Sequence, residues 1–374
     1  MGLGIGPMFL APLSEFFGRR YIYLTSFTLF ILFLIPCAAA TNIQTLLIAR
    51  FLNGFAGSAF LSVAGGSVGD MWAGRDLGGP MMLYTASPFV GPVVGPLIGG
   101  YVNQNISWRW TYYILIIWAF LQLGLLFFFV PETYHPVLLR NKARRLRATT
   151  GDERYFTPIE KLSRTIPATI AISCLRPFQL LFFEPMVLLL CTLTAVLLGI
   201  LYLFFQGFPL VFGNVYGMSL QEVGLTFLGL FVGMLLGTLT DPYWRSIYTK
   251  LVKQHSHPAP EFRLPPAIFG SVLVPIGLFI FAFTTGVSGG HWIFPIIGSA
   301  LFATGTLLVF TGVFTFLVDA YPLYAASALA ANSFMRSSFA AGFPLFSYRL
   351  YDSLGYQWGT GLLAFLTLGL MPFP

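Results

Sequence analysis

Apolar residues along this chain gather into long runs separated by short polar segments. Ten runs are long enough to be spanning helices, namely residues 21–40, 45–69, 80–101, 108–130, 187–212, 220–241, 267–286, 292–318, 324–348 and 356–374. A helix of roughly 20 residues crosses the hydrocarbon core of a bilayer. Because lipid offers backbone groups no hydrogen-bond partners, each run is predicted to be helical.

One further apolar stretch, residues 1–14, is too short to span a bilayer. It has no polar residues ahead of it, which indicates the second half of a helix whose start is absent. A signal peptide is the alternative, but the stretch lacks a basic start and a convincing cleavage site.

Composition supports a multi-pass membrane protein. Hydrophobic residues make up 56% of the chain and charged residues 9%, whereas soluble domains carry about 25% charged residues. The net charge of +7 raises the question of nucleic acid, but the basic residues collect in alternate loops, so no nucleic-acid partner is expected. Cys37, Cys174 and Cys191 have no metal-ligand spacing, and neither a metal site nor a disulfide is predicted.

The basic residues also predict the orientation of the chain, because cytoplasmic loops are enriched in Lys and Arg. They lie in alternate loops, at Arg19, Arg20 and Arg75, at nine positions from Arg140 to Arg176, and at Arg245, Lys250, Lys253 and Arg263. We therefore predict an N-terminal transmembrane half over residues 1–130, a cytoplasmic linker over 131–186 and a C-terminal transmembrane half over 187–374.

The run from Gly91 to Gly100 combines two Gly-Pro pairs and a closing Gly-Gly inside an apolar segment. Its glycines recur every four residues, which makes a groove that another helix can approach closely. Its prolines recur at the same spacing and remove backbone donors, so they bend or stiffen the helix at defined places. The helix is predicted to pack closely and to constrain motion.

This run resembles the fifth-helix motif of proton-coupled drug antiporters of the major facilitator superfamily. The motif residues are Gly91, Pro92, Gly95, Pro96, Gly99 and Gly100. The resemblance implies an all-α membrane fold of two pseudo-symmetric helical bundles. It also implies that Gly91, Gly95 and Gly99 pack between the two halves and limit proton leak.

The segment from Ala11 to Arg20 is similar to the signature loop of the same superfamily, with Ala11 in place of the usual glycine. The later half repeats its start as Gly237-Thr238-Leu239-Thr240-Asp241, with Arg245 close behind. Two apolar runs precede the second copy but only residues 1–14 precede the first, so about 11 of 12 helices are expected to be present. A family with eleven helices is the alternative.

The signature residues are predicted to form a cytoplasmic latch, comprising Glu15, Gly18, Arg19, Arg20, Asp70, Arg75, Asp241 and Arg245. Glu15 can meet a helix N-terminus or a basic side chain, and the arginines can pair with acids such as Asp70 or Asp76. Breaking such pairs as two halves rock apart gives a two-state element. Simple positive-inside anchoring is the alternative.

Arg50 lies inside an apolar helix, where a guanidinium needs a cavity or a polar partner. The surrounding sequence resembles a fourth-helix motif that is implicated in proton coupling in the family. Arginine does not deprotonate near neutral pH, so its predicted role is to tune a nearby carboxylate or water chain. Snorkelling to the outer interface is the alternative.

The polar residues in the other helices predict the substrate cavity. Five are assigned to it: Asn53, Tyr202, Gln206, Asn332 and Arg336. Phenylalanines flank them, and aromatic walls with few polar groups suit lipophilic or amphipathic organic molecules. Arg336 can equally brace the C-terminal half.

The hypothesis is a monomeric secondary transporter in the lipid bilayer that exports drugs, xenobiotics or polyamines by proton antiport with alternating access. Further resemblances, such as Pro131-Glu132-Thr133 and Arg176-Pro177, are typical of fungal members. Without nucleotide-loop or catalytic motifs, neither an enzyme nor a cofactor is expected. A non-transporting sensor or receptor, or an inactive truncated product, is the alternative. The plasma membrane is the predicted location, with the vacuolar membrane as the alternative.

Overall fold

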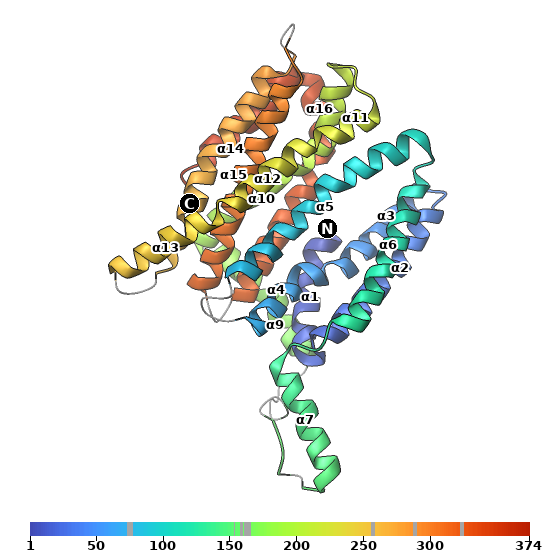
Figure 1. The fold of residues 1–374 in the computed structure, drawn as a ribbon, viewed down its shortest axis with the longest axis vertical. Coiled ribbons are helices and arrows are strands. Elements are labelled where there is room, and N and C mark those ends of the chain that lie inside the picture. Colours follow the sequence, from blue (N-terminus) through green and yellow to red (C-terminus); the bar gives the residue numbers. More distant parts are fainter. Residues whose placement is uncertain are drawn as a thin grey trace. The chain divides into compact units, whose positions relative to one another are not determined.

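The computed structural model describes residues 1–72, 78–152, 154–157, 160, 166–255, 259–286, 290–321 and 325–374 (Figure 1). Within these ranges the regular elements are all helices. Seven of the described helical segments are long and apolar enough to cross a membrane. The expectation of an all-α membrane protein is confirmed.

The chain divides into two compact units. One unit comprises residues 1–84 and 109–179, and the other comprises residues 85–108 and 180–374. The second unit takes most of the Gly-Pro helix, α5 (Gly78–Asn105), although that helix precedes the linker. Each unit therefore contains residues from both sides of the predicted boundary at residues 130–131. The division into an N-terminal half, a linker and a C-terminal half stays a prediction.

The first unit is built around α2 (Arg19–Ala39), which packs on α3 (Ile43–Gly57) and on α6 (Arg109–Phe129). The short helix α1 (Gly2–Phe17) packs against α3 and against α4 (Ala59–Met71). Its approach is close because it presents Gly2 and Gly6, where an added Cβ would collide with α3 and with Ser58.

Most of α6 faces outward. Only Tyr112 and Ala119 are buried in α6, while Trp118 and Leu121 are 60% and 62% exposed. An outward apolar surface on a helix of this length is typical of contact with lipid.

The segment predicted as a linker contains helices. After α6 come α7 (His135–Thr150), with its basic residues, and α9 (Ile166–Phe183). The nine basic residues from Arg140 to Arg176 predicted a loop over residues 131–186. Helix α7 instead begins with Pro136 in its first turn and ends at Gly151, which adopts φ 68°.

The second unit contains the remaining helices: α10 (Pro185–Phe208), η2 (Pro209–Gly213), α11 (Leu220–Thr226), α12 (Leu228–Leu239), α13 (Asp241–His255), η3 (Pro260–Arg263), α14 (Pro265–Thr284), α15 (Ile293–Ala320) and α16 (Ala325–Leu370). The core is aromatic, and the fully buried rings of Phe204, Phe208, Phe281 and Phe302 contact one another. Helices α14 and α15 meet through Gly277 and Gly298, where an added Cβ would reach within 2.7 Å of the opposite backbone.

Two boundaries differ from the predicted runs. The run 220–241 continues as helix α13 to His255, so Arg245, Lys250 and Lys253 lie on a helix rather than in a loop. The runs 324–348 and 356–374 are joined in α16, with the interruption at Gly355, where φ is 71°. Residues 349–354, which include two leucines and the buried Tyr351 and no proline, extend the first helix.

Candidate functional site

The described signature residues of the first unit meet at the turn between α1 and α2. Gly18 makes this turn with φ 100° and ψ 156°, a conformation that favours glycine. An added Cβ at Gly18 would also collide with the carboxylate of Glu132. The glycine is thus required both by the backbone conformation and by the acid beside it.

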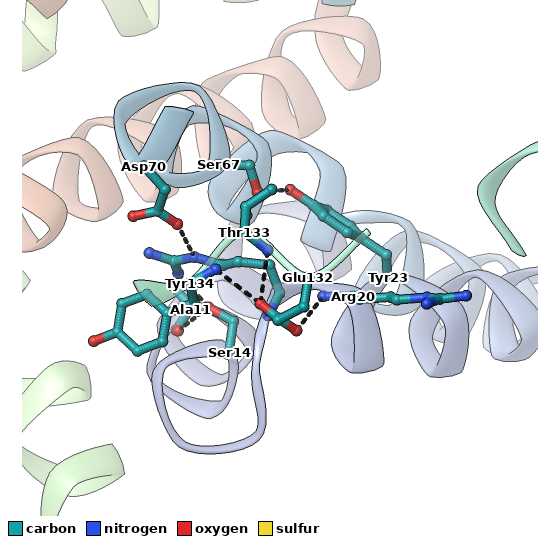
Figure 2. A network of polar contacts seen from close by, with 10 residues as sticks. Ala11, Ser14, Arg20, Tyr23, Ser67, Asp70, Glu132, Thr133 and Tyr134 are labelled. Atoms are coloured by element: carbon teal, nitrogen blue, oxygen red, sulfur yellow. Dashed lines mark hydrogen bonds and ion pairs between the residues drawn. The ribbon is translucent and has the colours of Figure 1, made fainter. Parts of the chain in front are cut away.

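Glu132 satisfies four backbone donors with one carboxylate. Its Oε1 accepts from the amides of Arg19 at 2.9 Å, Thr133 at 3.1 Å and Tyr134 at 2.9 Å, while its Oε2 accepts from Arg20 at 3.1 Å (Figure 2). Arg19 and Arg20 begin α2, and the first amides of a helix lack partners within the helix. A carboxylate at this end also meets the positive end of the helix dipole. Glu132 therefore fastens the end of α6 to the start of α2.

The side chain of Arg19 is 10% exposed and touches three further groups. Its Nε donates to Asp70 Oδ2 of α4 at 3.1 Å, and its Nη1 donates to Ser14 Oγ at 2.5 Å. The guanidinium also lies 4.8 Å from the ring centroid of Tyr134. Burial raises the pKa of the Tyr134 hydroxyl, and the nearby Glu15 carboxylate acts in the same direction.

A second bond joins the same two helices. The hydroxyls of Tyr23 on α2 and Ser67 on α4 are 2.7 Å apart (Figure 2). Gly66, next to Ser67 and one turn before Asp70 on α4, leaves room for the Arg19 guanidinium, because an added Cβ would approach Nη2 to 2.8 Å. Helices α2 and α4 are thus tied by an ion pair and a hydroxyl contact.

The remaining predicted latch residues of this unit, Glu15, Arg20 and Arg75, do not share one arrangement. Within the described part of the chain, Glu15 is exposed and enters no ion pair, and the carboxylate at the helix N-terminus is Glu132 instead. Arg20 donates to the Phe127 carbonyl at 2.8 Å rather than to an acid. Arg75 and Asp76 lie outside the described residues. The latch itself stays a prediction.

The second copy of the signature is arranged differently. Arg245 Nε lies 2.5 Å from Asp241 Oδ2, four residues earlier on α13. This pair is local to one helix, whereas Arg19 and Asp70 join two helices. A further ion pair, Arg263 with Asp319 at 2.8 Å, links η3 to α15.

Arg50 on α3 has an aromatic partner. Its Nε and Nη2 donate to the Tyr112 hydroxyl of α6 at 3.0 and 2.7 Å, and its guanidinium lies 5.0 Å from the same ring. The side chain therefore has a partner at membrane depth. Asn53, one turn later, is buried and donates to the Phe30 carbonyl of α2 at 2.8 Å. Asn53 thus contributes to packing within the first unit.

The other predicted cavity residues belong to the second unit. Asn332 is fully buried, and its Nδ2 donates to Thr194 Oγ1 at 2.7 Å and lies 3.5 Å from Cys191 Sγ. One turn further along α16, the Arg336 guanidinium lies over two rings of α15, 5.4 Å from Phe310 and 4.9 Å from Phe314. Polar groups of α16 and aromatic rings of α15 are thus placed side by side.

Tyr202 and Gln206 lie one turn apart on α10. Tyr202 packs edge-on against Phe205 with ring centroids 5.3 Å apart. Gln206 accepts a hydrogen bond from the Ser347 hydroxyl of α16. The structure places four of the five predicted cavity residues in the second unit and Asn53 in the first, and their role in binding stays a prediction.

The Gly-Pro helix makes its close contact on an unexpected face. An added Cβ at Gly91 or Gly95 would meet no described atom within 4 Å. At Gly100 it would lie 2.8 Å from the Leu220 carbonyl of α11, and at Gly224 it would lie 2.7 Å from the Pro96 carbonyl. Gln104 adds a side-chain acceptor for the Gln221 amide at 2.8 Å. Close packing between α5 and α11 therefore falls on Gly100, and the packing of Gly91, Gly95 and Gly99 between the two halves stays a prediction.

Three partners of the site were not assigned from the sequence: Glu132, Tyr112 and Thr194. Glu132 carried a usable signal, since an acid directly after a spanning run lies where helix ends meet. Tyr112 and Thr194 carried none, because one tyrosine or threonine in an apolar helix is common and only the rotation of the helix selects it.

The chain matches known proteins along its whole length. The sequence profile described as Major Facilitator Superfamily matches residues 1–344. The efflux pump atB of Aspergillus terreus is 58% identical to this chain. The alignment includes all of this chain and 79% of the length of atB. The probable drug/proton antiporter YHK8 of Saccharomyces cerevisiae is 43% identical, with 73% of its length covered.

Solved structures agree on the fold. The human organic anion transporter MFSD10 superposes with a TM-score of 0.68 at 16% identity, over all of this chain and 80% of that one. A proton:xylose symporter, XylE, superposes with a TM-score of 0.65 at 15% identity, over all of this chain and 82% of that one. The profile match and the two fungal relatives show, in agreement with the helical fold, that this chain belongs to the major facilitator superfamily.

Proposed function

We propose that this chain is a secondary active transporter that exports small organic molecules in exchange for protons. The observation that carries the proposal is its similarity, over the whole chain, to an efflux pump and to a probable drug/proton antiporter of fungi. The Gly-Pro run of α5, which resembles the antiporter motif, supports export over import.

The substrate side of the proposal rests on the second unit. Arg336, Tyr202 and Asn332 place a cation, a hydroxyl and an amide near a set of aromatic rings. Rings and few polar groups bind lipophilic organic molecules, and the polar groups orient them. A fixed guanidinium also favours substrates that present a carbonyl, hydroxyl or acidic group to it.

The proton side of the proposal rests on Arg50 and Tyr112. Arg50 remains charged at physiological pH, so it acts by fixing the electrostatic potential around a titrating group or a water chain. The two hydrogen bonds from Arg50 hold the Tyr112 hydroxyl in one position. In this proposal the hydroxyl, which accepts from the guanidinium, donates its own hydrogen to water or to a substrate.

The direct test is transport by vesicles that contain the purified chain. An imposed pH gradient is expected to drive accumulation of at least one compound from a panel of azoles, polyamines and organic cations, and a protonophore is expected to abolish it. Substrate binding without gradient-driven transport across the panel would favour a sensor. Neither binding nor transport would favour an inactive product.

A pair of substitutions separates coupling from simple anchoring. Arg50→Ala is expected to abolish gradient-driven transport, whereas Tyr112→Phe removes only the hydroxyl and is expected to reduce it by roughly tenfold, as loss of about 1.4 kcal/mol would. Downhill substrate efflux and chain stability are measured in parallel. An Arg50→Ala variant with unchanged gradient-driven transport would show that this arginine only snorkels to the interface.

A further inference from the structure

Helix α7 has two different faces. With 100° between successive residues, Val137, Arg140, Ala143, Arg144 and Arg147 fall on one side. Val137 and Ala143 are buried there. Arg140 Nη1 donates to the Phe16 carbonyl at the end of α1 at 3.1 Å, and Arg147 Nη2 donates to Glu160 Oε1 at 2.6 Å. The cations of this face are used within the protein.

The opposite face carries three leucines and two cations. Leu138, Leu139 and Leu146 are 43%, 39% and 36% exposed, and Lys142 and Arg145 are exposed between them. In the portion of the chain that the structure describes, neither cation enters an ion pair. No acidic residue occurs in α7 at all. This outer face of α7 therefore combines apolar side chains with positive charges and carries no negative charge.

The chain holds α7 near the end of a spanning helix. Only residues 130–134 separate α6, a candidate span, from the first residue of α7. The Arg140 bond to Phe16 fixes the middle of α7 at the end of α1, and Figure 1 shows α7 following directly on the end of α6. A helix tethered in this way begins beside the end of a candidate span, where the headgroup region of a bilayer would lie.

We propose that the outer face of α7 docks on anionic lipid headgroups of the cytoplasmic leaflet. Amphipathic helices with leucines and basic residues on one face lie at the headgroup boundary, where the leucines enter the acyl region. Each nearby Lys or Arg adds about 1 kcal/mol of attraction to an anionic surface. The interleaving of Leu138, Lys142, Arg145 and Leu146 on one stripe favours lipid over an acidic protein partner, which would need no row of leucines.

The test places a polarity-sensitive fluorophore on each face of α7 in the whole chain. The partly exposed Cys174 is replaced by serine, and Leu139→Cys or the control Ala148→Cys is labelled. The protein is inserted into nanodiscs of phosphatidylcholine alone or with phosphatidylserine. At position 139, phosphatidylserine is expected to shift the emission to the blue and to permit quenching by spin-labelled lipid. Position 148 is expected to show neither change.

Replacing the two cations provides the decisive comparison. The double variant Lys142→Gln/Arg145→Gln is expected to lower the partition of the outer face into the anionic surface by roughly 30-fold, as two lost charges predict, and high salt is expected to act in the same direction. Both residues are exposed, so the fold is retained, and circular dichroism checks this. Identical spectra at position 139 in both lipid compositions would overturn the proposal, as would a blue shift already present in detergent, which would show another segment or protein on this face.

Discussion

Arg19 has several distinct partners, each of a different kind. Asp70 supplies a charge, Ser14 a hydroxyl, Tyr134 a ring face and Glu132 an acceptor for the backbone amide. Hydrogen bonds to charged groups contribute about 1.5–3 kcal/mol each when a partner is left unsatisfied by its removal. Glu132 stands out because its carboxylate accepts from four backbone amides.

Replacing Glu132 is therefore expected to destabilise the first unit. Glu132→Ala leaves four amides without their acceptor and should lower the free energy of unfolding by roughly 3 kcal/mol, whereas Glu132→Gln keeps one acceptor oxygen and should lose about half as much. Thermal unfolding in detergent measures both. The exposed acid Asp352 offers a control, and equal midpoints for Glu132→Ala and Asp352→Ala would contradict the assignment.

A second residue-scale prediction concerns pH. The hydrogen bond from Arg147 holds the pKa of Glu160 below its ordinary value of 4.5. A lowered carboxyl pKa means that the pair stabilises the fold above pH 4.5 and that this contribution is lost as pH falls through the lowered pKa. The protection factors of the amides in the last turn of α7, from which the intrinsic pH dependence of exchange is divided out, are expected to fall as the pH decreases below 4.5.

Glu160→Gln supplies the control for this titration. The amide cannot titrate, so the excess pH dependence of exchange should disappear in the variant and exchange should be faster throughout neutral pH. Parallel pH profiles for the two proteins would show that the pair does not order the end of α7.

At the scale of elements, the Gly-Pro helix makes its close contact with α11 at the later end of the motif. The glycine spacing of four residues predicted a groove along Gly91, Gly95 and Gly99, but the contact with α11 lies at Pro96 and Gly100. A helix with glycines on more than one side offers several grooves, and the partner's own glycine, Gly224, selects between them. The periodicity alone cannot make that choice.

Alanine substitutions distinguish the two faces. Gly100→Ala places a methyl 2.8 Å from the Leu220 carbonyl, and such overpacking costs about 1–3 kcal/mol. Gly95→Ala meets no described atom within 4 Å and gains up to about 1 kcal/mol of helix propensity. Thermal unfolding should fall for the first and stay level or rise for the second. The reverse order would place the packed face on the Gly91 stripe.

At the scale of the whole molecule, the two copies of the signature are unequal. In the first, Arg19 joins α2 to α4 across 51 residues of sequence. In the second, Asp241 and Arg245 lie on one helix, and such i,i+4 pairs contribute only about 0.3–0.5 kcal/mol. The repeat in sequence therefore does not imply a repeat in stability.

This inequality gives a direct prediction. Asp70→Asn leaves the largely buried Arg19 guanidinium without its counter-charge and is expected to cost about 2–3 kcal/mol. Asp241→Asn is expected to cost less than about 0.5 kcal/mol. Unfolding of the two variants under identical detergent conditions compares them. Similar losses would mean that the second copy has a partner beyond its own helix.

The sequence by itself determined the fold class, the family and the membrane character. Long apolar runs form helices in lipid because a helix satisfies its backbone hydrogen bonds within one segment. This outcome does not depend on which neighbours the helix packs against. The same holds for the Gly18 turn, which glycine alone adopts readily, and for the signature motifs that carry the family resemblance. The relatives named as an efflux pump and as a probable drug/proton antiporter agree with the transport hypothesis.

Only the tertiary structure decided which side chains meet. The acceptor at the start of α2 is Glu132, 113 residues after Arg19, rather than the nearby Glu15. Arg50 faces Tyr112 and Asn332 faces Thr194 because of how the helices are rotated. In apolar helices that rotation depends on side-chain volumes and glycine contacts spread over several neighbours, so a local pattern fixes that a helix forms but not which residue it presents to its partner.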